Sequence, residues 1–270
     1  GIITVKDLLL APKDAVLRDI METNIKFVST HTDQEEAARA LSKYDFLALP
    51  VVDGEERLVG IVTVDDAIDV IQEEATEDIE KMAAMAPSDK PYMKTSILDT
   101  WKKRVPWLLF LMISATFTSS IINSFEDALA ASVVLTGFIP MLMDTGGNSG
   151  SQSSITIIRG LSLGEIRYGD VPRILLKEGS VALMCGCTLA VANFIKLMLI
   201  DRVTLLVAGV VCLTLLMVVM VANIVGSTLP ILAKRLGFDP TVMASPLITT
   251  IVDAVSLVIY FNIAKAVLRI

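Results

Sequence analysis

The stretch FIPMLMDTGGNSGSQSSITIIRG, residues 138–160, places an acid, two amides and several hydroxyls inside a strongly apolar region. Polar groups within a bilayer core are costly unless they face a bundle interior or a wet cavity. The stretch is therefore a candidate functional site, and oxygen-bearing side chains of this kind suit a water-filled path. The residues predicted to line it are Asp144, Gly146, Gly147, Asn148 and Gln152. As an alternative, the glycines permit close helix packing and Asp144 is an acid at the membrane interface.

A second candidate is Asp253, an isolated acid in the last apolar run of the chain. It follows Pro240 by 13 residues, and the rise of a helix then places it about 20 Å from the inner membrane surface. Thr249 lies one turn earlier on the same helix face. An acid at that depth is expected to serve an ion or proton path. The alternative is a protonated or capped aspartate held between helices.

The elements that position these residues are five apolar segments. Each has at least the ~20 residues that cross a bilayer core: residues 105–125, 128–158, 175–200, 203–232 and 240–268. The chain is 53% hydrophobic with a mean hydropathy of +0.65. Residues 1–104 hold 21 of the 30 acidic residues and 13 of the 23 basic ones. We therefore expect a mainly α membrane protein with five transmembrane helices, preceded by an acidic soluble part and without a nucleic-acid partner.

The basic residues predict the orientation in the plasma membrane. Four of them lie on one side: Lys196, Arg202, Lys265 and Arg269. The other side is predicted to be cytoplasmic and carries Lys102, Lys103, Arg104, Arg159, Arg167, Arg173, Lys177, Lys234 and Arg235. This arrangement puts the soluble part in the cytoplasm, and it puts the turn at Glu126–Asp127 and the C-terminus outside.

The soluble part contains an internal repeat, because GIITVKD at residues 1–7 matches GIVTVDD at residues 60–66. We interpret residues 1–14 as the end of a first module and residues 15–72 as a second module. Helical spacing covers residues 33–43, strands are expected at 48–52 and 58–62 around a turn at Asp53–Gly54, and a helix follows from Val64. The predicted order is βαββα.

An acidic connecting helix and its linker are predicted over residues 73–100, ahead of a transmembrane domain at 101–270. The acidic stripe begins within the preceding module, and its candidate ligands are Asp66, Asp69, Glu73, Glu74, Glu77 and Asp78, with Glu80 one turn further on. Like charges at this spacing weaken a helix, and a hard divalent cation with oxygen ligands relieves the repulsion. The stripe is therefore a candidate regulatory metal site. The alternative is a solvated helix face.

The segment LPVVD…LVGIVTVDD resembles the CBS module, an α/β unit that usually works in pairs. Together with the acidic helix, the five spans and the motif GGNSGSQ at 146–152, it resembles the MgtE-type magnesium transporters or channels over essentially the whole chain. Family members often have an asparagine where this chain has Ser151. The family's amino-terminal acidic domain and the first half of its CBS pair have no counterpart in this sequence.

The resemblance implies that Asp253 binds the permeating Mg²⁺ and that cytosolic Mg²⁺ closes the path. It implies an adenine nucleotide such as ATP at Thr4 and Asp7 and at Thr63 and Asp66. Those residues also suit a helix cap and a first-turn acid. Because one deep carboxylate per chain is a sparse site for a divalent ion, we expect a homodimer. Both a channel and a carrier are compatible with this sequence.

Enzyme chemistry is not expected. The residues GNSG at 147–150 resemble the serine motif of intramembrane rhomboid proteases, but a serine nucleophile needs a base. The single histidine, His31, lies in the soluble module, which also excludes an HExxH zinc site. Cys185, Cys187 and Cys212 are interpreted as packing residues. The remaining alternative is a transporter of another divalent cation such as Mn²⁺ or Co²⁺, although no soft ligand accompanies Asp253.

Overall fold

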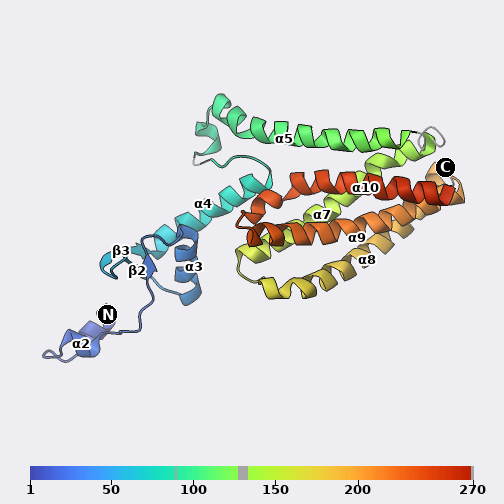
Figure 1. Cartoon of the computed structure of the whole chain (residues 1–270). Coiled ribbons are helices and arrows are strands. Elements are labelled where there is room, and N and C mark those ends of the chain that lie inside the picture. The colour runs from blue at the N-terminus through green and yellow to red at the C-terminus, as the bar shows by residue number, and fades with distance from the viewer. Residues whose placement is uncertain (89, 127–132, 269–270) are drawn as a thin grey trace. The chain divides into compact units, whose positions relative to one another are not determined.

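The computed structural model describes residues 1–88, 90–126 and 133–268 of the chain. Two compact units divide it, Gly1–Thr76 and Glu77–Ile270. Figure 1 shows strands and short helices in the first unit and long helices in the second. The mainly helical fold predicted from the sequence is confirmed.

The first unit carries the predicted βαββα order. Strand β1 (Val28–Ser29) pairs parallel to β2 (Ala48–Val52), and β2 pairs antiparallel to β3 (Leu58–Thr63). Helix α3 (Gln34–Tyr44) begins at Asp33, whose side chain accepts a hydrogen bond from the Glu35 amide at 2.8 Å. Helix α4 (Val64–Met82) follows β3 directly. Two short helices, α1 (Val5–Leu10) and α2 (Leu17–Ile20), precede this module.

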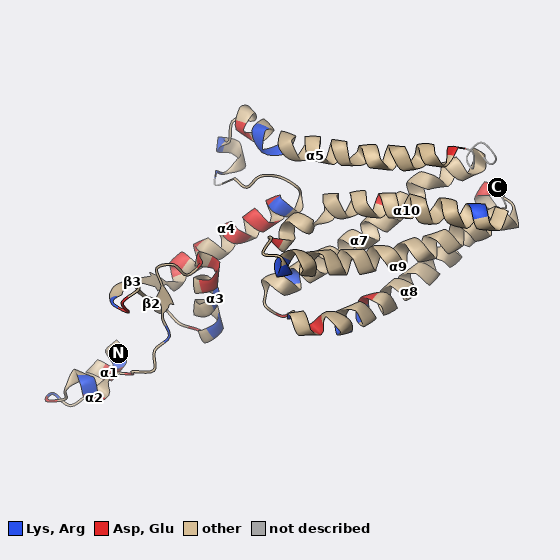
Figure 2. Cartoon of the chain, in the orientation of Figure 1, with Lys and Arg blue, Asp and Glu red and all other residues tan. Residues whose placement is uncertain are grey.

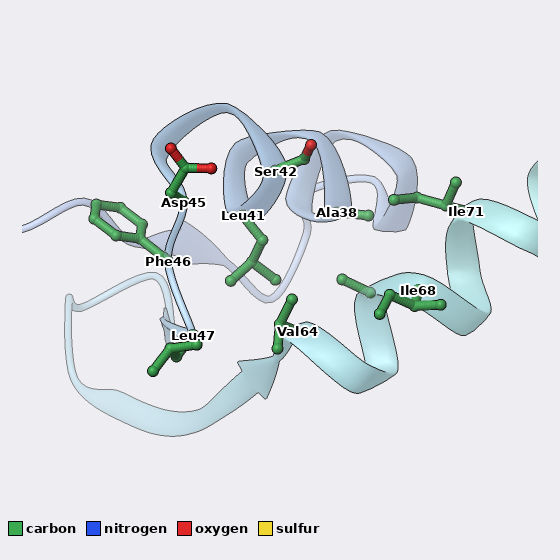
Figure 3. A pocket seen from close by; sticks show the side chains of 10 residues that line it. Ala38, Leu41, Ser42, Asp45, Phe46, Leu47, Val64, Ile68 and Ile71 are labelled. Carbon is green, nitrogen blue, oxygen red and sulfur yellow. The ribbon is translucent and has the colours of Figure 1, made fainter.

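The core of this module is small. Its buried members are Ala38, Leu41, Leu49 and Ala67. Beside it, α3 and α4 leave an apolar hollow of about 360 Å³, shown in Figure 3. Ile68 and Ile71 line this hollow and keep 59% and 46% of their surface exposed. The module therefore leaves a large share of its apolar surface uncovered within one chain.

The second unit is built from five long helices. These are α5 (Ile97–Ser124), α7 (Ile139–Ser162), α8 (Val171–Lys196), α9 (Leu205–Arg235) and α10 (Ser245–Leu268). Short helices η1 (Tyr92–Lys94), η2 (Val133–Phe138), η3 (Tyr168–Asp170), η4 (Leu197–Asp201) and η5 (Pro240–Met243) join or extend them. Helix α9 is central, because its buried residues Val210, Val211 and Val219 join a core that also contains Leu142 of α7 and Phe261 of α10.

Four of the five predicted spans are helices long and apolar enough to cross a membrane: α5, the η3–α8–η4 segment, α9 and α10. The fifth, α7, has 24 residues but is not among these four. It begins at Ile139 rather than near residue 128, because η2 precedes it. Part of the predicted span and the turn residue Asp127 fall at 127–132, outside the described residues, as do Asp89 of the linker and Arg269.

The first predicted span, in contrast, begins earlier than its hydropathy indicates. Helix α5 starts at Ile97 because the hydroxyl of Ser96 accepts a hydrogen bond from the Asp99 amide at 3.1 Å and so caps the helix. The basic residues Lys102, Lys103 and Arg104 therefore lie inside α5 and not in a loop before it. No residue of α5 among those described is buried.

Candidate functional site

Helix α7 has a packed face that contains the glycines of the motif. An ideal Cβ on Gly146 would lie 2.6 Å from Val218 Cγ1 of α9, and one on Gly150 would lie 3.1 Å from the Ala222 carbonyl. The closest approach is at Gly226 of α9, where a Cβ would lie only 2.2 Å from the Gly150 carbonyl oxygen. Such distances require glycine, so the helix backbones themselves are in contact here. This geometry supports the packing alternative for Gly146 and Gly150, while their role in lining a path stays a prediction.

The other face of α7 is open. Asp144, Asn148 and Gln152 follow one another at one-turn spacing and are all exposed. The amide of Asn148 donates to Asp144 Oδ2 at 3.1 Å, so these two side chains are aligned along the helix. An open polar stripe on a helix of this bundle offers oxygen atoms to water or a cation.

Helix α10 brings a second carboxylate to this stripe. Gly146 of α7 packs on Val252 of α10, where its Cβ position would be 2.9 Å from Val252 Cγ1, so Asp144 and Asp253 lie close to the same helix contact. One turn earlier on α10, Thr249 packs on Gly147, whose Cβ position would be 3.0 Å from the Thr249 methyl group. We name Asp144, Asn148, Thr249 and Asp253 the α7–α10 site. Asp253 lies eight residues into α10, about 12 Å along it, and η5 precedes this helix, so its depth of about 20 Å from the inner membrane surface stays a prediction.

The site is sparse in ligands. Among the described residues, no three His, Cys, Asp or Glu side chains gather closely enough to hold a metal ion. Two acids with amide and hydroxyl oxygens resemble the surroundings of an ion that keeps part of its hydration shell. The arrangement therefore suits passage of a hydrated ion better than tight binding within one chain.

Other polar groups of the bundle are packed away from this site. Asn223 of α9 is 6% exposed and donates to the Ser149 hydroxyl at 2.6 Å. Ser153 lies 3.2 Å from the Asn223 carbonyl and 2.8 Å from Glu178 Oε2. Glu178, on α8, was not predicted as a site residue. Because it lies seven residues into an apolar helix, its charge alone could have marked it as a candidate site residue.

Two residues that share a helical face with Asp253 lie in the core. The hydroxyl of Tyr260 is fully buried and donates to the Leu135 carbonyl at 2.9 Å. Ser256 is 2% exposed, and its oxygen lies 3.0 Å from the Cβ position of Gly146. Helical periodicity groups them with Asp253, but the packing of α7 separates them from the open face.

The acids of α4 are partly engaged already. Figure 2 shows acidic residues along α4, whereas the charges of α7, α8, α9 and α10 gather mainly near helix ends. Glu74 accepts a hydrogen bond from Gln34 at 2.7 Å, and Glu80 accepts one from the Ser88 amide at 2.6 Å. Asp66, Asp69 and Glu73 are exposed, whereas Glu77 and Asp78 are half-buried. The predicted stripe is thus most accessible at its beginning.

At the end of α4, Lys81 forms an ion-pair cluster that sequence reasoning missed. Its ammonium lies 2.5 Å from Glu77 and 2.7 Å from Asp239, the residue before η5. Burial alone lowers the pKa of Lys81, but hydrogen bonds to Asp239 and Glu77 outweigh it and raise the pKa above its ordinary value. Burial likewise raises the pKa of Asp239, yet hydrogen bonds from Lys81 and Thr241 hold it below its ordinary value. Nothing in the sequence links residues 158 positions apart.

The predicted nucleotide residues form two matching pairs. The Thr4 hydroxyl donates to Asp7 at 2.5 Å, and the Thr63 hydroxyl donates to Asp66 at 2.6 Å. Hydrogen bonds from Thr4 hold the pKa of Asp7 below its ordinary value. Thr4 caps α1, because its hydroxyl also accepts a hydrogen bond from the Asp7 amide at 3.1 Å, whereas the Thr63–Asp66 pair stands at the start of α4. The apolar hollow of Figure 3 contains neither pair.

Comparison with known proteins is consistent with this organisation. Residues 139–263 match the family model MgtE, described as "Divalent cation transporter", and residues 17–73 match the CBS domain model. The chain is 42% identical to "Magnesium transporter MgtE" of Thermus thermophilus over 269 residues, which cover 100% of this chain and 59% of the relative. It is 38% identical to the protein of the same name from Bacillus subtilis, with 98% and 58% covered. The chain thus spans less than two thirds of these relatives.

A solved structure described as "Crystal structure of the soluble part of a magnesium transporter" is 45% identical over 28% of this chain and 29% of its own, with a TM-score of 0.27. A second, "Crystal structure of the cytosolic domain of the Mg2+ channel MgtE in complex with ATP", is 51% identical over 25% and 27%, with a TM-score of 0.25. The matched family is one of transporters and not of enzymes, as expected from the sequence. The chain thus contains a CBS domain followed by a domain that matches the MgtE family.

Proposed function

We propose that this protein transports Mg²⁺ across the plasma membrane and that the ion passes the α7–α10 site. The observation that carries the proposal is that Asp144 of α7 and Asp253 of α10 lie near the contact of Gly146 with Val252, beside the amide of Asn148, in an otherwise apolar bundle. The relatives named as magnesium transporters support the choice of cargo.

The chemistry of the site fits a hydrated ion. Mg²⁺ dehydrates reluctantly, so a path for it needs a few carboxylates and neutral oxygens that hydrogen-bond its water shell. Asn148, Gln152 and Thr249 supply such oxygens around the two acids. No cysteine or histidine belongs to this set, which disfavours a soft-metal cargo.

The active form in this proposal is a homodimer. One chain offers two carboxylates, and a second copy would double the ligands around a shared path. The apolar hollow between α3 and α4 supports association, because exposed Ile68 and Ile71 line it. Exposed apolar surface of this kind commonly marks an interface.

Regulation is proposed to act through the acids of α4. Cytosolic Mg²⁺ would bind weakly at Asp66, Asp69, Glu73, Glu74, Glu77 and Asp78, and closure would rise with its concentration because the ion binds the closed form more tightly. The unit containing residues 1–76 would lie in the cytoplasm and the C-terminus outside. An adenine nucleotide at the Thr4–Asp7 and Thr63–Asp66 pairs belongs to the same proposal.

Flux into liposomes tests the proposed function. In Asp253→Asn, loss of a charged ligand should reduce Mg²⁺ flux by at least about tenfold, because contacts to charged groups contribute ~1.5–3 kcal/mol. The matched control is Asp201→Asn, which removes an acid that pairs with Lys196 at the far end of α8. Equal flux in both variants would contradict the role of Asp253. Flux of Mn²⁺ or Co²⁺ exceeding that of Mg²⁺ would instead favour the alternative cargo.

A further inference from the structure

Helix α8 is attached to the bundle by one face only. Its buried residues are Ala182, Gly186 and Asn193, spaced to lie along a single side. At Gly186 an ideal Cβ would lie 2.7 Å from Leu216 Cδ1, which places this side against α9. The opposite side therefore faces away from the described bundle.

That opposite side joins two cations to an apolar strip. Arg173 and Lys177 lie one turn apart and are both exposed. The strip continues along the helix with Leu176 and Met184, which are 75% and 71% exposed. Basic side chains followed along a helix by exposed apolar side chains suit the boundary between lipid headgroups and acyl chains.

The acids beside these cations are engaged elsewhere. Asp170 accepts a hydrogen bond from the Arg167 amide at 2.9 Å, and Glu178 accepts one from the Ser153 hydroxyl at 2.8 Å. Within the described part of the chain, neither Arg173 nor Lys177 forms an ion pair. Both charges are therefore available to an external anion.

The other end of the bundle is different. There Lys196 pairs with Asp201 at 2.7 Å, and the Lys265 ammonium lies 4.8 Å from the centre of the Phe125 ring. At the Arg173 end, Lys234 donates to the Leu161 carbonyl at 3.0 Å, but Arg159 and Arg235 are exposed and add to the positive charge. Among the described residues, the basic residues without an ion pair are therefore more numerous at the Arg173 end, although Arg202 at the other end is also exposed and has no ion pair.

We propose that Arg173 and Lys177 form a binding site for the headgroup of an anionic phospholipid, with Leu176 and Met184 against its acyl chain. Arginine can bind two phosphate oxygens at once, and lysine adds a point charge one turn further along the helix. Basic positions at helix ends attract anionic lipids in this way. The apolar continuation favours a lipid over free phosphate, because a soluble anion would gain nothing from Leu176 or Met184.

Native mass spectrometry of the full chain tests this proposal. The protein would be released from nanodiscs that contain equal amounts of phosphatidylglycerol and phosphatidylcholine. Arg173→Gln/Lys177→Gln should retain about 25-fold less phosphatidylglycerol, since each of the two charges near the surface contributes on the order of a fivefold effect. Lys196→Gln/Arg202→Gln removes the same charge at the other end and should retain as much as the parent. Arg173→Lys/Lys177→Arg should also bind normally.

Equal phosphatidylglycerol retention in the two glutamine variants would overturn the site. Displacement of the lipid by millimolar inorganic phosphate would show that any phosphate anion suffices, which contradicts the lipid assignment. Melting temperature and elution volume of each variant serve as folding checks. If the glutamine variant were unfolded, loss of phosphatidylglycerol on the single change Leu176→Gln, with Leu199→Gln as the matched control, would decide the question.

Discussion

The two faces of α7 use similar residues for different purposes. On the packed face, Gly150 meets Gly226 and the side chains around it are satisfied inside the bundle. On the open face, Asn148 donates a hydrogen bond to Asp144, and both side chains are exposed. A polar residue in an apolar span therefore does not by itself mark a path. What distinguishes the two cases is whether the polar side chain forms its hydrogen bonds with neighbouring helices or remains exposed.

Changing Gly226 to alanine should disturb the packed face of α7 most severely. The new methyl group would overlap the Gly150 carbonyl, which is backbone and cannot move aside. We expect a loss of about 3 kcal/mol or more of stability, at the upper end for overpacking, or no folded protein. Melting temperature and yield in detergent measure it. Gly209→Ala on the same helix has no atom within 4 Å of its Cβ and should be neutral or slightly stabilising.

Asn223→Ala tests the hydrogen bonds of the packed face. It leaves the Ser149 hydroxyl without the amide donor that lies 2.6 Å away, so the unfolding free energy should fall by about 1–2 kcal/mol. The matched variant is Asn262→Ala. That exposed amide donates only to the Val258 carbonyl of its own helix, and its loss should change stability by less than about 0.5 kcal/mol. Equal melting temperatures for the two variants would argue against a special role for buried amides.

The Lys81–Asp239 pair is partly buried, and its removal should change the free energy of unfolding least among these predictions. Its hydrogen bonds lower the pKa of Asp239, so its contribution to stability is present above the unfolded-state value of about 3.9 and is lost as the pH falls through the lower folded value. Because the pair is over a quarter exposed, we expect less than about 1 kcal/mol.

The measurement is the difference in melting temperature between the parent and Asp239→Asn as a function of pH. Asparagine keeps an oxygen that can still accept from the Thr241 amide, so only the charge is removed. The difference should be constant from pH 7 to 5 and shrink as the pH falls below 4. A difference that grows on acidification would show that the pair does not stabilise the native state.

Much of this molecule could be predicted from local patterns. Apolar runs on either side of a turn place β2 and β3, and helical spacing places α3, each within a residue or two, and hydropathy finds four of the spans. The second span was predicted about ten residues too early, because apolar composition cannot distinguish η2 from the start of α7. For α5 the error has the opposite sign. The helix begins at Ile97, before the predicted start at residue 105, because Ser96 caps it.

The site was predictable in its residue types but not in its division of roles. Charge and depth single out Asp144 and Asp253, while periodicity alone adds Tyr260, which packing buries against Leu135. Which glycines touch another backbone depends on the crossing of α7 and α9, and no local pattern encodes that crossing. The same limit explains why the Lys81–Asp239 pair was missed.

The contact between Gly150 and Gly226 also limits how the bundle can deform. A slide of α7 along α9 by one turn, about 5.4 Å, would bring either Gly146 or Ser154 to the position that Gly150 now holds. Only the first of these lacks a side chain, so the close contact of the two backbones could be kept after a slide in one direction but not in the other. Helix α5 has no buried residue among those described, so no comparably close contact fixes its position along the bundle.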